Sequence, residues 1–179
     1  MKLVPLPAAY RWIDKEPSPR MLVEMRKVYG TKEVKGPGSN PSIVAWAKSL
    51  GFQNFQDATP WCGLGMAYVA LQAGYEPPIN PLWAANWLTW GTPVPLKGAM
   101  LGDVLVFHRK GGNHVSLYVG EDDKAMHIMG ANQADSVNIE RKSKNLLIGV
   151  RRSPWRLNQP ANVRKVHLAI VGALAENDA

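Results

Sequence analysis

The hydrophobic pattern of this chain of 179 residues changes its period once, close to residue 100. Before that point, apolar residues recur every three or four positions between proline and glycine signals, which is typical of amphipathic helices. After it, they alternate or run in short blocks, as at 103–107 and 114–120, which is typical of β-strands. Helices first and strands later predict an α+β fold, in which N-terminal helices precede an antiparallel sheet of about five strands.

Four helices are expected in the N-terminal part, each from a start signal and a closing glycine. Ser18-Pro19 begins the first and Asn40-Pro41 the second, because a polar residue before a proline favours a helix start. The third begins near Trp61-Cys62, and the fourth follows Asn80-Pro81. The five expected strands occupy residues 103–107, 114–120, 125–129, 136–140 and 146–151.

The end of the chain differs from the rest, so we assign residues 1–153 to one domain and residues 154–179 to a basic C-terminal tail. Pro160 is a helix-start signal, and the pattern over 161–175 predicts a basic amphipathic helix. We expect this helix to bring the protein to anionic surfaces. The competing interpretation is that the tail docks on the sheet through Val163, Val166, Ile170 and Leu174.

The charge balance is 21 basic against 14 acidic residues, a net charge of +7. A field of this sign attracts polyanions such as nucleic acid, anionic lipid or acidic cell-wall polymers. The basic residues are dispersed along the chain and no nucleic-acid motif accompanies them, so we do not expect a nucleic-acid partner. The charge therefore predicts only that the partner is anionic, a class that includes an anionic wall or outer-membrane surface, and the expected state is a monomer.

The first residues predict the compartment in which the chain is made. The apolar stretch near the N-terminus is short and is broken by Pro5 and Pro7. A secretion signal needs an uninterrupted apolar core of about 7–15 residues, and a membrane-spanning helix needs about 20. The sequence therefore predicts synthesis in the cytoplasm, without a signal peptide or a transmembrane segment.

Cys62 is the only cysteine, which excludes an internal disulfide and a multi-cysteine metal site. It stands in the first turn of an expected helix, where the helix dipole favours a thiolate and lowers the pKa of the thiol. Its neighbour Gly63 is small and is expected to leave room for a substrate, and Trp61 is a candidate wall of a cleft. The alternative is that Cys62 is simply a buried apolar residue.

His114 is the histidine best placed to act with this thiol. It follows a Gly-Gly-Asn turn and begins a strand, so it lies at an end of the sheet that a helix N-terminus can approach. Cysteine on a helix and histidine on a later strand is the order of a papain-like pair. His108 is expected to be solvated, His127 to pack in the sheet, and His167 to belong to the tail. A zinc site with Cys62 is an alternative that no ligand spacing supports, so we expect no metal.

A Cys/His pair usually needs a third polar group that holds the imidazole. Asn132 lies 18 residues beyond His114, a separation suited to an adjacent antiparallel strand, and is the expected orienting residue. Gln133 is the alternative, and a third interpretation is that both amides serve a turn. Asp103 opens a strand and is expected to be a structural cap rather than a catalyst. Asp57 is a candidate for lining the cleft.

Five segments, taken together in order and spacing, resemble one family. They are Glu33–Asn40, Asp57–Cys62, Gly102–Asp103, Gly112–Val115 and Gly130–Gln133. Over residues 17–152 the chain is similar to the phage-associated branch of the CHAP/NlpC-type cysteine amidohydrolases and peptidases. It departs from many relatives at Gly63-Leu64, where a small hydroxyl residue is commoner after the cysteine.

The resemblance implies a papain-like fold and hydrolysis of an amide bond in peptidoglycan, in the stem peptide or at the muramoyl-L-alanine linkage, without a cofactor. It also implies that Cys62 is the nucleophile, His114 the general base and Asn132 the orienting residue. The expected function is an endolysin-like hydrolase made in the host cytoplasm that acts on the periplasmic peptidoglycan and lyses the cell. Two alternatives are a secreted antibacterial effector amidase and an inactive phage module that binds the wall or serves a structural role.

Overall fold

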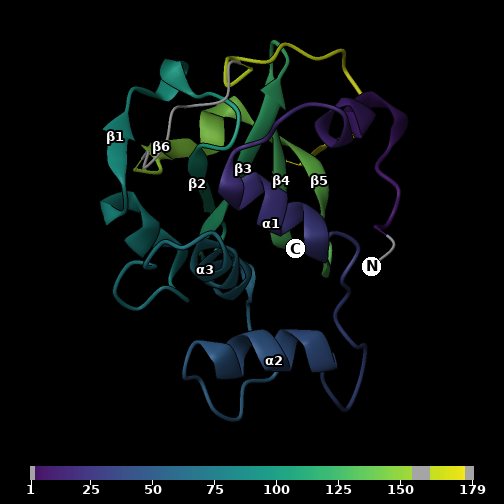
Figure 1. The fold of residues 1–179 in the computed structure, drawn as a ribbon, viewed down its shortest axis with the longest axis vertical. Coiled ribbons are helices and arrows are strands. Elements are labelled where there is room, and N and C mark those ends of the chain that lie inside the picture. Colours follow the sequence, from purple (N-terminus) through teal and green to yellow (C-terminus); the bar gives the residue numbers. More distant parts are fainter. Residues whose placement is uncertain (1–2, 155–161, 176–179) are drawn as a thin grey trace.

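The structure is a computed structural model that describes residues 3–154 and 162–175 (Figure 1). The helical elements are η1 (Ala8–Asp14), α1 (Arg20–Val28), α2 (Pro41–Ser49), α3 (Cys62–Gln72), η2 (Ala84–Thr89), η3 (Leu96–Gly98) and η4 (Lys144–Leu146), where η marks a 3₁₀ helix. The strands are β1 (Thr92–Val94), β2 (Val104–Arg109), β3 (Gly112–Glu121), β4 (Ala125–Gln133), β5 (Ser136–Ser143), β6 (Leu147–Arg152) and β7 (Leu174–Ala175).

The strands form one mixed sheet in the order β1-β6-β2-β3-β4-β5-β7. Neighbouring strands are antiparallel except β5 and β7, which run parallel. The expected papain-like arrangement, N-terminal helices followed by a five-stranded antiparallel sheet, is therefore wrong. The two unforeseen strands, β1 and β7, lie at the edges, where two or three residues are too few to show a period in the sequence.

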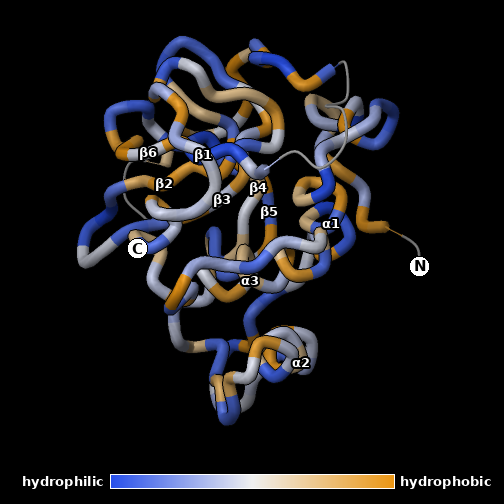
Figure 2. The backbone as a smooth tube through the Cα atoms, turned by 60° about the vertical axis from the view of Figure 1, so that its left-hand side comes forward, coloured by the Kyte–Doolittle hydropathy of each residue, from blue (hydrophilic) through white to orange (hydrophobic). Residues whose placement is uncertain are grey.

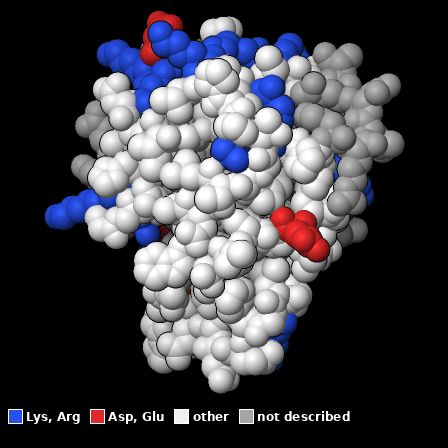
Figure 3. Space-filling view, turned by 90° about the vertical axis from the view of Figure 1, so that its left-hand side faces the viewer, with Lys and Arg blue, Asp and Glu red and all other residues white. Residues whose placement is uncertain are grey.

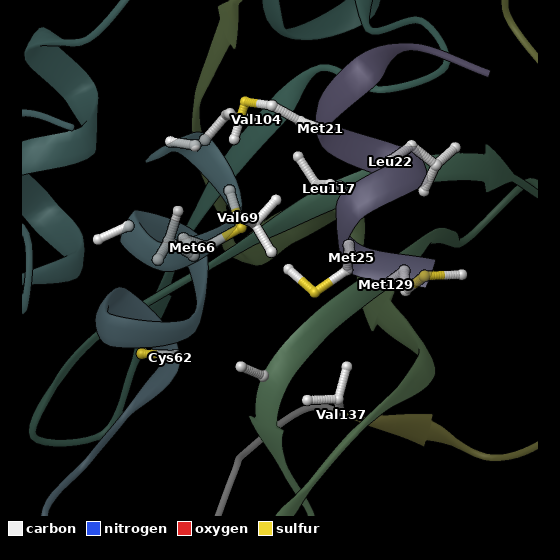
Figure 4. Packing of buried hydrophobic residues seen from close by; sticks show 14 of the residues in the cluster. Met21, Leu22, Met25, Cys62, Met66, Val69, Val104, Leu117, Met129 and Val137 are labelled. Carbon is white, nitrogen blue, oxygen red and sulfur yellow. The ribbon is translucent and has the colours of Figure 1, made fainter. Parts of the chain in front are cut away.

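Two hydrophobic clusters pack on opposite faces of this sheet. The alternation along β2 divides its residues between them: Val104 and Val106 belong to the first cluster, and Leu105 and Phe107 to the second. Helices α1 and α3 cover the first face, and Figure 4 shows their methionines meeting the central strands there. Helix α2 lies beyond α3, away from the sheet (Figures 1 and 2). Helix α3 packs against β3 and β4.

The helix starts follow the sequence signals in part. Asn40 caps α2 as expected, because its side chain accepts a hydrogen bond of 2.8 Å from the backbone N–H of Ser42. At α1, Pro19 rather than Ser18 is the N-cap residue, and it makes no side-chain cap bond. The fourth expected helix is the 3₁₀ helix η2, where the indole N–H of Trp87 donates to the carbonyl of Pro81.

The tail joins the sheet instead of forming the expected helix. Pro160 lies outside the described residues, and residues 162–175 are irregular until they form β7 beside β5. The backbone of Glu121 exchanges hydrogen bonds of 2.8 Å with Val166 and Leu168, and these bonds replace the helical pattern. Val166 is buried in the second hydrophobic cluster. The helix predicted from the sequence is therefore wrong for 162–175, and the docking interpretation is confirmed at Val166.

Among residues 3–154 and 162–175, no helix combines the length and the apolar character needed to cross a bilayer.

Candidate active site

Cys62 is the first residue of α3, and its side chain is buried at the edge of the first cluster (Figure 4). Burial raises the pKa of its thiol. The positive charge of Arg109 and hydrogen bonds from the backbone N–H groups of Val115, Gly63 and Cys62 act in the opposite direction. The expectation of a lowered pKa is therefore wrong, because the loss of hydration outweighs the helix N-terminus.

Gly63 does not leave room for a substrate as expected. A Cβ atom at this position would collide with the backbone carbonyl oxygens of Pro81 and Leu82. The loop before η2 therefore fills the space beside the first turn of α3, and the glycine permits that close approach.

Trp61 is fully buried, so it is a core residue rather than the wall of an open cleft. Its indole N–H donates a hydrogen bond of 3.0 Å to the carboxylate of Glu33, and its ring centroid lies 6.2 Å from that of Trp46. These contacts fix the position of the Trp61 side chain directly before Cys62.

His114 is fully buried near the start of β3. The ladder between β3 and β4 ends at the pair Leu117 and Met129, so it stops short of this histidine. A side-chain contact joins the two strands beyond that point, because Nε2 of His114 lies 3.1 Å from Oε1 of Gln133. Gln133, the alternative, therefore contacts the imidazole instead of the expected Asn132. The thiol of Cys62 lies against the backbone of Val115, the residue next to His114.

The amide of Gln133 is fixed in one orientation by Asn138 on β5. Nε2 of Gln133 donates to the backbone carbonyl of Asn138 at 3.1 Å and to its Oδ1 at 2.8 Å. Nδ2 of Asn138 in turn donates to the backbone carbonyl of Gln133 at 2.9 Å. The amide oxygen of Gln133 therefore faces His114, and a carbonyl oxygen only accepts hydrogen bonds. In the neutral imidazole, Nε2 carries the proton and Nδ1 is the basic nitrogen.

Asn132 stands one residue earlier in a left-handed conformation, with φ of 55°, which asparagine tolerates well. It lines a polar pocket of about 280 Å³, which we call the Arg109 pocket. Pro60 also lines this pocket two residues before Cys62, so the lining includes residues close in the chain to both Cys62 and Gln133. Its lining residues are Glu33, Ala58, Pro60, Arg109, Lys110, Asn132 and Asp135.

The two candidate aspartates hold loops. Asp57 is fully buried, and its Oδ2 accepts hydrogen bonds from the backbone N–H groups of Val34 at 3.0 Å and Asn40 at 2.7 Å. Its contacts organise the segment before α2 rather than a cleft. Asp103 accepts from the backbone N–H of Met100 at 2.9 Å and pairs with Arg152 at 2.7 Å, which are the contacts of a structural cap.

His127 belongs to a separate buried network on β4. Its Nε2 lies 2.9 Å from Oδ2 of Asp122, and its Nδ1 lies 2.7 Å from the hydroxyl of Tyr10. Arg141 donates to the same carboxylate oxygen at 2.7 Å. Because both ring nitrogens are engaged, His127 is not available as the base that acts with Cys62.

In the part of the chain that the structure describes, no three His, Cys, Asp or Glu side chains are grouped so that they could hold a metal ion. No protein-family model matches the chain, and no curated protein sequence matches it either.

Proposed function

We propose that this protein is a cysteine-dependent amide hydrolase that acts on peptidoglycan. The observation that carries the proposal is the hydrogen-bond chain from Asn138 through Gln133 to His114, whose neighbour Val115 has its backbone against the thiol of Cys62. A nucleophile, a base and a third group that orients the base are the parts that covalent amide hydrolysis needs.

The residues divide the chemistry between them. Nδ1 of His114 accepts the thiol proton as the sulfur of Cys62 attacks the amide carbonyl. The amide oxygen of Gln133 holds the resulting imidazolium by accepting a hydrogen bond from Nε2–H of His114. Backbone N–H groups at the start of α3 stabilise the negative charge that develops. The imidazolium then protonates the leaving amine, and a thioester remains on Cys62. Water, deprotonated by Nδ1, hydrolyses the thioester and restores the thiol.

The raised pKa of Cys62 decides the order of proton transfer. Because burial keeps the thiol protonated near neutral pH, its proton leaves as the sulfur attacks rather than beforehand. His114 is then needed as a base in the attack itself, so the orientation of its ring, which Gln133 fixes, matters for that step.

Peptidoglycan as the substrate is supported by two further observations. Five segments of the sequence resemble the CHAP/NlpC-type hydrolases, with Cys62 and His114 at the positions of their nucleophile and base. The net charge of +7 favours binding to anionic wall polymers, and Figure 3 shows Lys and Arg gathered at the end of the molecule away from α2. The bond cut lies in the stem peptide or joins it to the muramic acid, and the phage-associated resemblance favours an endolysin.

The proposal is tested by digesting purified peptidoglycan with the wild type, Cys62→Ala and His114→Ala, and identifying products by mass spectrometry. The wild type should release fragments with a new amine and a new carboxylate. Each variant should lose at least about 10³-fold in rate, because the two residues act as one unit. Equal melting temperatures for the three proteins show that folding is preserved. Retained release by Cys62→Ala, or no release by the wild type, contradicts the proposal.

A further inference from the structure

A buried hydrogen-bond donor beside the candidate site lacks an acceptor. Arg109 is the last residue of β2, opposite Gly112, and its side chain lines the Arg109 pocket. Its Nε is buried and has no hydrogen-bond partner among the described residues. A buried donor of a charged group is costly to leave unsatisfied, so the pocket favours a ligand that brings an acceptor.

The chemistry of the guanidinium selects the ligand. Its N–H groups form a planar fork that matches the two oxygens of a carboxylate. A phosphate would meet the same fork, but the carboxylates of Glu33 and Asp135 balance the two positive charges of Arg109 and Lys110 in the lining, which disfavours a multiply charged anion. The same two carboxylates suit an ammonium group next to the bound carboxylate. The pocket therefore fits one carboxylate of a peptide, alone or beside an amine.

The position of the pocket links this carboxylate to the reacting bond. Pro60 leads into Cys62, and Asn132 leads into Gln133, which holds His114. The charge of Arg109 acts directly on the thiol of Cys62. The pocket is therefore linked to the candidate site through Pro60, through Asn132 and through the charge of Arg109.

We propose that Arg109 binds a free carboxylate of the substrate peptide next to the scissile amide. The enzyme thereby distinguishes acidic stem peptides from stem peptides whose carboxylates are converted to primary amides. A primary amide presents one oxygen acceptor and two competing donors, so it cannot satisfy the fork of the guanidinium. This inference rests on the proposed function for the identity of the peptide. The residues that line the pocket are the reason to expect a carboxylate as the bound group.

The test compares one stem peptide in two forms, with its carboxylates free or amidated, on the wild type and Arg109→Gln. The wild type should hydrolyse the acid form with kcat/KM at least about 10-fold above the amide form, and Arg109→Gln should abolish this preference. Arg109→Lys should retain part of it. Lys124→Gln changes the net charge equally at an exposed site and should leave the preference intact. Equal rates for the two forms on the wild type, or an equal loss on both forms in Arg109→Gln, overturns the inference.

Binding separates this inference from the proposed hydrolysis. Calorimetric titration of Cys62→Ala with each peptide should give tighter binding of the acid form, and the double variant with Arg109→Gln should lose that difference. If the wild type cuts neither peptide but the binding difference is found, the carboxylate site stands and the hydrolase proposal fails. If both forms are cut and bound alike, the hydrolase proposal stands and the carboxylate site fails.

Discussion

Nε2 of His114 and Oε1 of Gln133 lie 3.1 Å apart at the point where the β3–β4 ladder has already ended. Both side chains are fully buried, so the hydrogen bond between them is shielded from water and strengthened by the low local dielectric. One contact thus joins two strands and fixes the tautomer of the imidazole. The candidate base is held by the sheet itself rather than by a mobile loop.

This contact predicts that Gln133 matters more for turnover than Asn132. Gln133→Ala removes the acceptor of the Nε2 proton, so the ring loses its tautomer and its orientation, and kcat should fall by about 10²-fold or more. Asn132→Ala leaves the contact in place and should change KM more than kcat, because Asn132 lines the Arg109 pocket. Steady-state kinetics on soluble wall fragments measure both. Gln133→Glu keeps an acceptor and should retain more activity than Gln133→Ala. A larger loss of kcat in Asn132→Ala would contradict the assignment.

The choice between these two neighbouring amides lay beyond the sequence for a physical reason. The pairing of β4 with β5 shifts its register between Gly130 and Gln133, and Asn132 turns left-handed within that shift. Successive residues of a strand point to opposite faces, so a local irregularity decides which amide meets the histidine. Asn138, which fixes the amide of Gln133, is an ordinary polar strand residue, and the sequence carries no signal for its role.

The start of α3 and the strand that carries His114 were predictable because their signals are local. A helix start or a Gly-Gly-Asn turn depends on a few adjacent residues; α3 begins at Cys62 as expected, and β3 begins at Gly112, two residues before the expected start at His114. The pKa of Cys62 was not predictable, because it depends on how deeply the thiol is buried by distant segments. The close packing at Gly63 was not predictable either, because it depends on the distant loop at Pro81 and Leu82.

Alkylation of Cys62 should show the direction of its pKa shift. Burial raises the pKa of this thiol, so the reactive thiolate forms at higher pH than on an exposed cysteine. Inactivation by iodoacetamide should therefore be slow at neutral pH and accelerate as the pH rises. Arg109→Gln removes a positive charge that favours the thiolate, so its rate profile should move to still higher pH. Mass spectrometry of the modified protein over time gives the rates, and a shift to lower pH would exclude this role of Arg109.

Metal removal provides a separate check on the thiol mechanism. Treatment with EDTA should leave wall hydrolysis unchanged, since the proposed chemistry uses Cys62, His114, Gln133 and backbone donors and no metal ion. Loss of activity with EDTA and its recovery on adding a divalent cation would show that a metal ion takes part.

The network around Asp122 should be a main contributor to stability. Its buried carboxylate accepts hydrogen bonds from His127 and Arg141, and its pKa lies well below the usual range. Asp122→Asn leaves Arg141 as a poorly compensated buried charge, so we expect unfolding in urea at pH 7 to show a loss of about 3–5 kcal/mol. Asp123→Asn changes an exposed neighbour and should cost little.

The pH dependence of this loss follows from the lowered pKa. A carboxyl group whose folded-state pKa is depressed stabilises the protein above its unfolded pKa of about 3.9 and loses that contribution as the pH falls toward the folded value. The difference in unfolding free energy between the wild type and Asp122→Asn should therefore shrink from pH 7 to pH 3. A difference that grows on acidification would contradict the assignment of Asp122 as the stabilising ionised group.

The tail should stabilise the fold, because its described residues complete the sheet. A protein that ends at Pro154 loses buried Val166 and the pairing of β7 with β5, and its melting temperature should fall by about 5–10 °C. Val166→Ala should reproduce part of this loss, whereas Ile170→Ala changes a side chain that is 68% exposed and should not. If the tail served only to attract anionic walls, truncation would leave melting unchanged and weaken the salt dependence of lysis. Salt shortens the Debye length from about 10 Å at 0.1 M to about 3 Å at 1 M, so a salt series separates the two roles.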